Sequence, residues 1–221
     1  MNNNFVVIDA IYRSRMTLLD ILGDRGYDIE KYRKFSPDEA TAAIAAGAYT
    51  GLSFKVEHLN SDKVCDVRYV SSISRQKLDG FFDYISDEDA PNTEVIVMLQ
   101  DPISDAHHVC ALKQYVKFTE NVGEQGQRER RKLRVSFFTI YTIVINPLKH
   151  VLVPKHEIVP EEEHKALMES MYIVSKAKFP QIKFHVDPIT RCIGAVPGDI
   201  IKITRPSASS GVAIIYRVCI A

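Results

Sequence analysis

Apolar side chains recur at helical spacing near the start of the chain and alternate with polar ones further on. Residues 5–22 place an apolar side chain at every third or fourth position, which predicts an amphipathic helix that Gly23 ends. Residues 36–39 (Ser-Pro-Asp-Glu) have the spacing of a capped helix start, with serine as the N-cap residue. Apolar residues then alternate at 52–56 and at 65–69, so we expect two paired strands there.

Helices and strands continue to alternate as far as the middle of the chain. The further elements expected are a helix at 72–85, a strand at 95–99, a helix from Ser104 or Asp105 to Leu112, a strand at 115–118, a charged surface loop at 119–132 and a buried strand at 135–145. This alternation predicts a small N-terminal domain of the α/β or α+β class, of which we favour α/β within an α+β chain. The apolar run at 135–145 has 11 residues, about half of what a membrane-spanning helix needs.

The pattern changes after Asn146-Pro147, where we expect a boundary between domains at 1–145 and 146–221. Pro160 and the three glutamates after it predict a helix start, with Leu167, Met168 and Met171 facing inward. The other expected elements are a short helix from Asp187 to Gly194, a turn at 197–199 and strands near 201–203 and 212–218. The fold class predicted for this part is a small α+β domain with an antiparallel sheet.

Composition and charge narrow the class of protein. The chain has 221 residues, of which 46% are hydrophobic and 25% charged, as in ordinary globular proteins. With 28 basic and 28 acidic residues the net charge is zero, which argues against a protein that binds nucleic acid alone through a dense basic field. The four cysteines form no Cys-x-x-Cys unit, and the chain start does not resemble a signal peptide. We therefore expect an intracellular protein from a reducing compartment.

Familiar catalytic motifs are missing from the chain. It has no Gly-x-Ser-x-Gly elbow, no P-loop and no Gly-x-Gly-x-x-Gly turn. His156 and Glu157 begin like the zinc-protease motif His-Glu-x-x-His, but Pro160 holds its last position. Residues 94–96 (Glu-Val-Ile) have isoleucine where the Glu-x-Lys of a metal nuclease has lysine. We therefore expect no catalytic residues, no cofactor and no metal site.

Three weaker patterns each allow a functional and a structural interpretation. His150, His156 and His164 are six and eight residues apart, which does not place them on one helical face, so hydrogen-bonded or solvated side chains are favoured over metal ligands. Residues 209–211 (Ser-Ser-Gly) either bind a phosphate through their backbone amides or form a simple hairpin loop, and we favour the hairpin loop. The basic residues at 128–134 either contact a phosphate backbone or form a solvated loop.

An ordered series of short motifs in the last third of the chain resembles one known family. The motifs are Leu-Val-Pro-Lys-His at 152–156, Phe-Pro-Gln-Ile at 179–182, Asp-Pro-Ile-Thr-Arg at 187–191 with Gly194, Pro-Gly-Asp-Ile-Ile-Lys-Ile-Thr-Arg-Pro-Ser at 197–207, Ser-Ser-Gly at 209–211 and Tyr-Arg at 216–217. The series is similar to the fifth-by-size small subunit shared by eukaryotic RNA polymerases, whose archaeal counterpart lacks the N-terminal domain. Residues 24–27 (Asp-Arg-Gly-Tyr) match the same family after its first helix.

The resemblance implies a non-catalytic subunit of DNA-dependent RNA polymerase that acts in transcription. It implies that residues 146–221 form an assembly domain that docks on the largest polymerase subunit, and that residues 1–145 form a jaw domain with a nuclease-like fold beside downstream DNA. The candidate docking residues are Pro154, His156, Asp187, Pro188, Gly194, Gly198, Lys202, Arg205, Ser207, Gly211, Tyr216 and Arg217. The candidates for a position near DNA are Ser104, Arg128, Arg130 and Arg131.

The expected jaw departs from the family pattern at one turn. The family often carries Thr-Pro-Ser-Ala near DNA, whereas this chain has Ser-Asp-Ala-His at 104–107. The carboxylate of Asp105 disfavours a close phosphate contact, and together with the net charge of zero it predicts weak DNA affinity for the isolated chain.

The resemblance also implies partners and a location. The expected partners are the largest subunit, the other polymerase subunits and downstream DNA within the complex, with transcription regulators as further partners and no membrane. The expected location is the nucleus, or the cytoplasm or virion for a viral chain.

The alternative from another class is a DNA-binding or nuclease-derived adaptor that acts outside polymerase. Mg²⁺-dependent cleavage by the purified chain would support a nuclease, and binding to a regulator without polymerase would support an adaptor.

Overall fold

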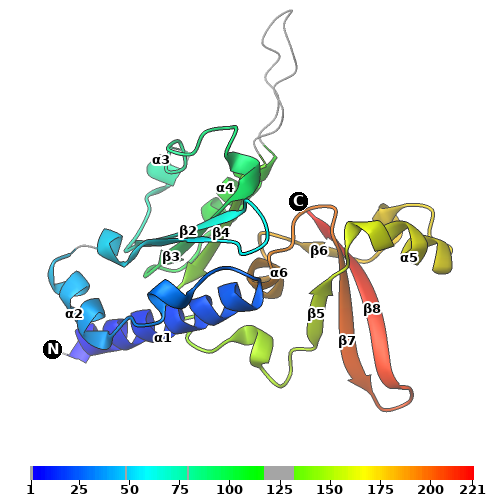
Figure 1. Cartoon of the computed structure of the whole chain (residues 1–221), viewed down its shortest axis with the longest axis horizontal. Helices are drawn as coiled ribbons and strands as arrows, with labels where there is room; N and C mark the ends of the chain where they lie inside the picture. Colours follow the sequence, from blue (N-terminus) through cyan, green and yellow to red (C-terminus); the bar gives the residue numbers. More distant parts are fainter. Residues whose placement is uncertain (1, 48, 79, 117–131) are drawn as a thin grey trace, which may run out of the picture. The chain divides into compact units, whose positions relative to one another are not determined.

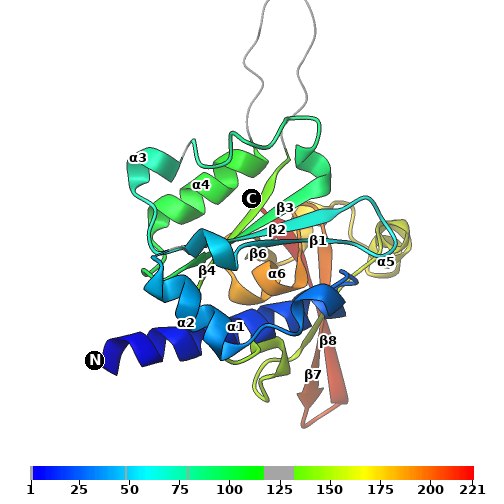
Figure 2. The same ribbon diagram turned by 60° about the vertical axis from the view of Figure 1, so that its left-hand side comes forward.

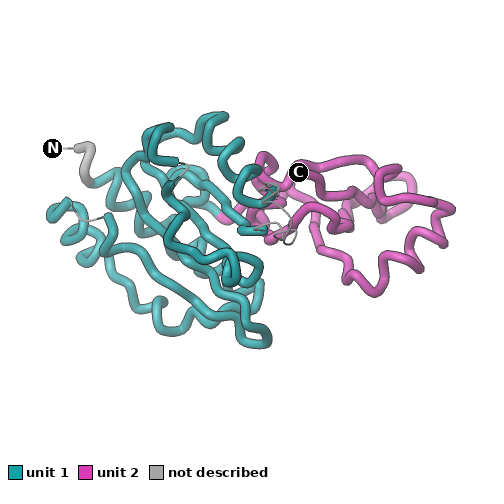
Figure 3. The backbone as a smooth tube through the Cα atoms, turned by 90° about the horizontal axis from the view of Figure 1, so that it is seen from above, with its two compact units in different colours: residues 1–145 teal, residues 146–221 magenta. Residues whose placement is uncertain are grey.

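A computed structural model describes residues 2–47, 49–78, 80–116 and 132–221. The chain divides into two compact units, Met1–Ile145 (unit 1) and Asn146–Ala221 (unit 2), which Figure 3 distinguishes by colour. None of the helices within the described ranges is long and apolar enough to span a bilayer.

Unit 1 is a three-layer α/β structure (Figures 1 and 2). Its sheet has the order β1-β2-β3-β4, in which β2, β3 and β4 are parallel and β1 is antiparallel to β2. Helices α1 and α2 cover one face, and α3 and α4 cover the other. The bounds are α1 Asn2–Asp24, α2 Pro37–Ala45, β1 Phe54–Glu57, β2 Val64–Val70, α3 Arg75–Leu78, β3 Thr93–Leu99, α4 Asp105–Tyr115 and β4 Arg134–Thr139, with 3-10 turns at Glu30–Tyr32, Tyr49–Leu52 and Ala90–Asn92.

The first helix and its end follow from the sequence with one difference. Helix α1 continues through Gly23 to Asp24, because the backbone reverses at Gly26, whose φ is 87°. Gly23 serves packing instead of ending the helix: a Cβ at this position would lie 2.7 Å from the side chain of Ile29. Helix α2 has the expected capping box between Ser36 and Glu39.

Three of the expected elements in unit 1 were wrong in extent. The helix expected at 72–85 is only α3 followed by turns, although Phe82 and Ile85 are buried as expected. The strand expected at 135–145 ends with β4 at Thr139, where Thr142 donates its N–H to the Thr139 hydroxyl (3.2 Å) and closes a turn. Tyr115 belongs to α4 and not to a strand; residues 117 and 118 lie outside the described residues. So does the loop expected at 119–132, except for its last residue.

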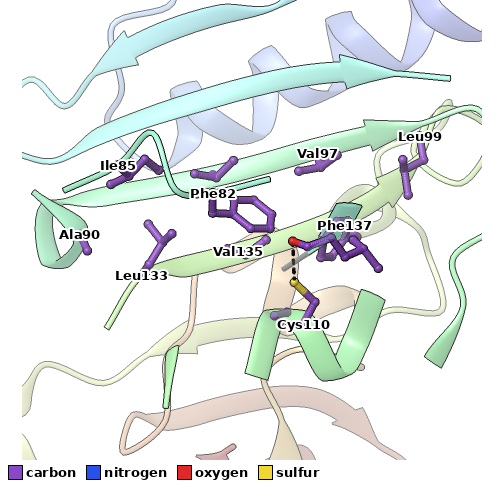
Figure 4. Packing of buried hydrophobic residues seen from close by; sticks show 12 residues of the cluster. Phe82, Ile85, Ala90, Val97, Leu99, Cys110, Leu133, Val135 and Phe137 are labelled. Atoms are coloured by element: carbon purple, nitrogen blue, oxygen red, sulfur yellow. Dashed lines mark hydrogen bonds between the residues drawn. The ribbon is translucent and has the colours of Figure 1, made fainter. Parts of the chain in front are cut away.

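The apolar residues of these segments fill the core between the sheet and α4 (Figure 4). The fully buried ring of Phe82 contacts the ring of Phe137 edge-on, with 6.2 Å between centroids. An irregular segment therefore contributes as much to this core as a helix would, because burial depends on where side chains point and not on regular backbone. Apolar spacing at 72–85 was correct for burial and misleading for secondary structure.

Unit 2 is an α+β structure around a four-stranded sheet of order β5-β7-β8-β6. Strands β5, β7 and β8 are antiparallel as expected, but β6 is parallel to β8. The chain returns from β6 to β8 through α6 and β7, a connection long enough for a parallel crossover. The bounds are β5 Lys155–Ile158, α5 His164–Ser170, β6 Gln181–Lys183, α6 Pro188–Ile193, β7 Ile200–Ser207 and β8 Gly211–Ile220, with 3-10 turns at Pro147–Lys149, Glu161–Glu163 and Lys176–Lys178.

The helix expected from Pro160 starts as a 3-10 turn and becomes α5 at His164. Leu167 and Met168 pack against the core formed by Val159, Phe179, Ile200 and Val218, as expected. Met171 was expected inside but is 43% exposed, because α5 ends one residue before it and Tyr172 turns the chain with a φ of 56°. The cluster under α5 is therefore closed by Leu167 and Met168 without Met171, while Ile201, Ile203 and Cys219 are buried elsewhere in the same sheet.

Candidate functional site

Half of the candidate docking residues lie on the β7–β8 hairpin. The register pairs Lys202 with Tyr216 and Arg205 with Ala213, and the hairpin closes at Ser207 and Gly211. Because side chains alternate between the two faces of a sheet, Lys202 and Tyr216 share one face while Arg205 shares the other with Ser207. The hairpin thus brings these residues together as neighbours but divides them between two surfaces.

The three basic candidates differ in what they contact. The side chain of Arg217 is half-buried and donates to the backbone oxygen of Gln181 at 3.1 Å, which links β8 to β6. Lys202 is half-buried in the middle of the sheet. Arg205 is exposed beyond the end of β5. Arg205 is therefore the cation with the greatest freedom to reach another molecule, and Arg217 has a structural role within the unit.

Helix α6 and the following turn hold the base of the hairpin. The Asp187 carboxylate accepts from the N–H groups of Ile189 (2.9 Å) and Thr190 (3.0 Å), which caps α6 ahead of Pro188. Gly194 ends the helix in the left-handed conformation, with a φ of 87°. The N–H of Gly198 then donates to the oxygen of Cys219 at 2.9 Å. These four candidates therefore set the position of β7 and β8 rather than presenting side chains for recognition.

The three histidines whose spacing was considered above each have a separate backbone partner. The ring of His156 lies 2.7 Å through Nδ1 from the oxygen of Pro154, so these two candidates form one local contact. His150 accepts from a backbone N–H at 3.2 Å, and His164 lies 3.0 Å from the oxygen of Val159. Across the part of the chain that the structure describes, no three His, Cys, Asp or Glu side chains are grouped as metal ligands would be. The four cysteines are free thiols.

The loop at 207–211 satisfies its own polar groups. The hydroxyl of Ser207 lies 3.3 Å from that of Ser209 and accepts from the N–H of Ser210 at 3.4 Å, and Gly211 has a φ of 70°. These are the contacts of a tight hairpin connection. The geometry therefore favours a hairpin loop over a phosphate-binding site at these residues.

Sequence reasoning missed the exposed apolar residues of unit 2. Val212 and Ile214 on β8 are 57% and 50% exposed, and Tyr172 and Val174 after α5 are 93% and 94% exposed. The available signal was the run Val-Ala-Ile-Ile-Tyr at 212–216, in which apolar residues occupy both faces of the strand. Neighbouring exposed apolar groups are typical of protein-binding surfaces, and Val212 and Ile214 are neighbours on one face of β8.

In unit 1, Ser104 and Asp105 form the start of α4. The N–H of Ser104 donates to Nδ1 of His107 at 3.0 Å, and Asp105 is the first residue of the helix, where a negative charge is favoured. Ser104 is thus engaged in a helix cap, and the nearest charge to it along the chain is negative. Arg128, Arg130 and Arg131 lie outside the described residues.

The carboxylate that the metal-nuclease pattern singled out is buried between two arginines. Arg25 donates through its two terminal guanidinium nitrogens to the two carboxylate oxygens of Glu94, and a guanidinium nitrogen of Arg134 lies 3.3 Å from the same carboxylate. Burial opposes the ionisation of Glu94, but Arg134 and Arg25 outweigh it and lower the pKa of the carboxyl below its usual value. Burial, reinforced by the Glu94 charge, raises the pKa of nearby Tyr27 to about 12. Glu94 is therefore an ionised structural group with both oxygens engaged.

Comparisons with known proteins agree with the placement of the motifs in unit 2. A profile of the family described as "RNA polymerase Rpb5, C-terminal domain" matches residues 145–219. The "DNA-directed RNA polymerase subunit Rpo5" of Pyrococcus abyssi is 52% identical over 75 residues, which cover 34% of this chain and 89% of that protein. That of Methanosarcina barkeri is 51% identical over 73 residues, 33% of this chain and 91% of that protein. The "DNA-directed RNA polymerases I, II, and III subunit rpabc1" of Dictyostelium discoideum is 26% identical over 218 residues, 96% of this chain and 98% of that protein.

Proposed function

The chain belongs to the Rpb5 family of RNA polymerase subunits, and we propose that it acts in transcription as a structural subunit of a DNA-directed RNA polymerase. The observation that carries this function is the similarity of unit 2, along nearly its whole length, to a polymerase subunit that consists of little else. Other polymerase subunits are its partners. The nucleus is the proposed location, after the eukaryotic relative of similar length.

Within the complex, we propose that unit 2 docks on the largest subunit. The support is the combination of an exposed cation and exposed apolar residues on one hairpin. Arg205 is suited to pair with a carboxylate of the partner, since a guanidinium binds a carboxylate through two parallel hydrogen bonds. The candidates Asp187, Gly194 and Gly198 contribute by holding the hairpin in shape.

Unit 1 is proposed as a jaw that lies beside downstream DNA and carries out no catalysis of its own. The engagement of Glu94 with Arg25 and Arg134 supports this role, because a carboxylate held by two guanidinium groups is not free to bind Mg²⁺. Asp105 at the start of α4 disfavours a close phosphate contact there. Transcription regulators are further proposed partners of this unit.

The test is a tagged pull-down from the native source with identification of the captured proteins. We expect the largest polymerase subunit, in near-stoichiometric amount, with the wild-type chain. Arg205→Glu is expected to reduce that amount at least tenfold while the free chain keeps its unfolding temperature. Lys34→Glu, an equal charge change at an exposed residue of unit 1, is the matched control and is expected to retain the partner.

Three results would contradict parts of the proposal. Capture of no polymerase subunit by the wild-type chain would refute polymerase membership and favour the adaptor alternative. Unchanged capture by Arg205→Glu would refute the assignment of Arg205 to the docking surface. Mg²⁺-dependent DNA cleavage by the purified chain would refute the absence of catalysis.

A further inference from the structure

Strand β8 has an edge that the strands of unit 2 leave largely uncovered. On one side β8 pairs with β7 along nearly its whole length, from Gly211 to Val218. On the other side the short strand β6 pairs only with residues 218–220. We call residues 211–217 along this side the open edge, and Figure 1 shows this part of β8 extending past β5 and β6. At the tip of the hairpin the N–H and C=O of Val212 are bonded to Ser210.

The hydrogen bonds at the base of the hairpin define which backbone groups point to the open edge. The N–H of Cys219 donates to the oxygen of Asp199 at 2.8 Å, toward β7, whereas the N–H of Val218 donates to the oxygen of Pro180 at 2.9 Å, toward β6. Because backbone direction alternates along a strand, the N–H and C=O groups of Tyr216 and Ile214 point the same way as those of Val218. These groups form a row that a neighbouring strand would pair with.

The opposite edge of the same hairpin carries protection that the open edge lacks. Beyond the end of β5, strand β7 continues with Arg205 and Pro206, a charge and a residue without an N–H donor, which are devices that keep free edges from pairing. Residues 211–216 of β8 contain no charged residue and no proline, and the one charge on the open edge, that of Arg217, is held against β6 by its hydrogen bond to the oxygen of Gln181. The two edges of one hairpin thus differ in the way expected if one faces solvent and the other is covered.

The side chains along the open edge indicate what covers it. Val212 and Ile214 project from the same face of β8 and are 57% and 50% exposed. A strand added at the edge would place alternate side chains beside these two, and apolar ones would remove them from water. A helix would cover the side chains but would leave the row of backbone groups unpaired.

We propose that an extended segment of another polymerase subunit, with apolar side chains at alternate positions, adds to the open edge of β8 as a strand. This inference rests on the proposed function, because the open edge belongs to the same hairpin as Arg205, Ser207 and Tyr216. It adds a backbone contact to the side-chain contacts proposed above. The segment takes the place next to β8 that β6 holds at residues 218–220.

Amide hydrogen exchange on the free chain and on the purified polymerase complex tests the backbone contact directly. The amides of Ile214 and Tyr216 are expected to exchange at least a hundredfold more slowly in the complex. The amides of Ala213 and Ile215 point toward β7 and are the internal reference, with slow exchange in both states. Unchanged exchange at Ile214 and Tyr216 in an assembled complex would refute strand addition while leaving the proposed function intact.

A variant pair provides the second measurement, by the same pull-down of polymerase. Ile214→Pro removes an N–H that makes no bond to β7, so the hairpin is retained, while the added strand loses a partner and meets the proline ring. Capture is expected to fall at least tenfold with Ile214→Pro and to stay within threefold with Ile214→Val, which keeps both the amide and an apolar side chain. Equal capture by both variants would refute the proposal.

Two further outcomes separate the alternatives. Failure of the wild-type chain to capture polymerase would refute the proposed function itself and, with it, this inference. Sedimentation of the free chain as a dimer, with the Ile214 and Tyr216 amides already protected, would show that a second copy occupies the edge and would refute the polymerase segment. Should Ile214→Pro fail to fold by circular dichroism, hydrogen exchange on the wild-type complex decides the matter.

Discussion

Strands β3 and β8 contain similar apolar runs but end up in opposite environments. The run Val95–Leu99 on β3 is buried on both faces, with no side chain more than 1% exposed. The run at 212–216 on β8 includes Val212 and Ile214, which are half exposed. Strand β3 lies between two parallel neighbours, and helices cover both faces of its sheet. Residues 211–217 of β8 pair with one neighbour within unit 2, the strand β7.

This difference separates a strand that completes its contacts within the chain from one that does not. A continuous apolar run ordinarily indicates burial on both faces of a sheet. Where the tertiary structure leaves such a run exposed at the edge of a sheet, the strand is able to pair with another molecule, which is what we propose for β8. Unit 1 is then expected to be stable by itself, whereas residues 211–217 of β8 are expected to gain contacts from a partner.

The largest effect is expected from the buried ionic cluster at the start of β3. Glu94→Gln leaves Arg25 and Arg134 buried without their shared negative charge, and we expect a loss of about 3–5 kcal/mol in the free energy of unfolding. Urea denaturation followed by circular dichroism measures it. The control is Glu157→Gln, which removes the exposed ion pair with Lys155 and is expected to change little. An equal loss in both variants would contradict the internal role of Glu94.

A matched pair of truncations compares the two apolar runs directly. Val97→Ala on β3 creates a cavity at a fully buried position, and we expect it to destabilise the free chain by about 2 kcal/mol. Ile214→Ala on β8 removes more atoms but is expected to cost under about 1 kcal/mol in the free chain, because half of that side chain is already in water. Thermal unfolding of both variants measures the difference, and a larger cost at Ile214 would reverse the comparison.

The smallest change in the free energy of unfolding is expected when the pH is lowered. The pKa of Glu94 is lowered in the folded chain, so its stabilising contribution is complete above its ordinary value of 4.5 and is lost as pH falls through the lowered value. One proton changes the free energy of unfolding by at most about 1.4 kcal/mol per pH unit. Unfolding of wild type and Glu94→Gln between pH 6 and 3 should show the steeper loss in wild type. Parallel curves would mean that Glu94 does not titrate differently on folding.

Local sequence signals predicted the capped helix starts and several turns of both units, although Gly23 does not end α1. The capping residues Ser36 and Asp187 and the turn at Gly194 lie where the spacing indicated, because a cap depends on contacts within three or four residues. The antiparallel hairpin at 200–220 followed from alternation in the same way. The family resemblance was also a local property, since it depends on short motifs in order along the chain.

Contacts between distant residues were not predictable in this way. The pairing of Arg25 with Glu94 and Arg134 joins three segments of unit 1, and no spacing rule indicates it. The segment 72–85 kept its burial but lost its helix, because tertiary contacts of Phe82 outweigh a modest helical preference. The parallel pairing of β6 was hidden for the same reason: strand neighbours are chosen by the fold as a whole.

The sequence by itself determined the family, the positions of caps and turns, and the identity of the residues on the β7–β8 hairpin. Only the tertiary structure decided which polar groups already have a partner within the chain. Arg217 binds the oxygen of Gln181, and Glu94 in unit 1 pairs with two arginines. Arg205 and the edge of β8 face outward. The physical reason is that residue type sets what a group is able to bind. The burial of that group and the neighbours that the fold brings to it decide whether it is already hydrogen-bonded or ion-paired within the chain.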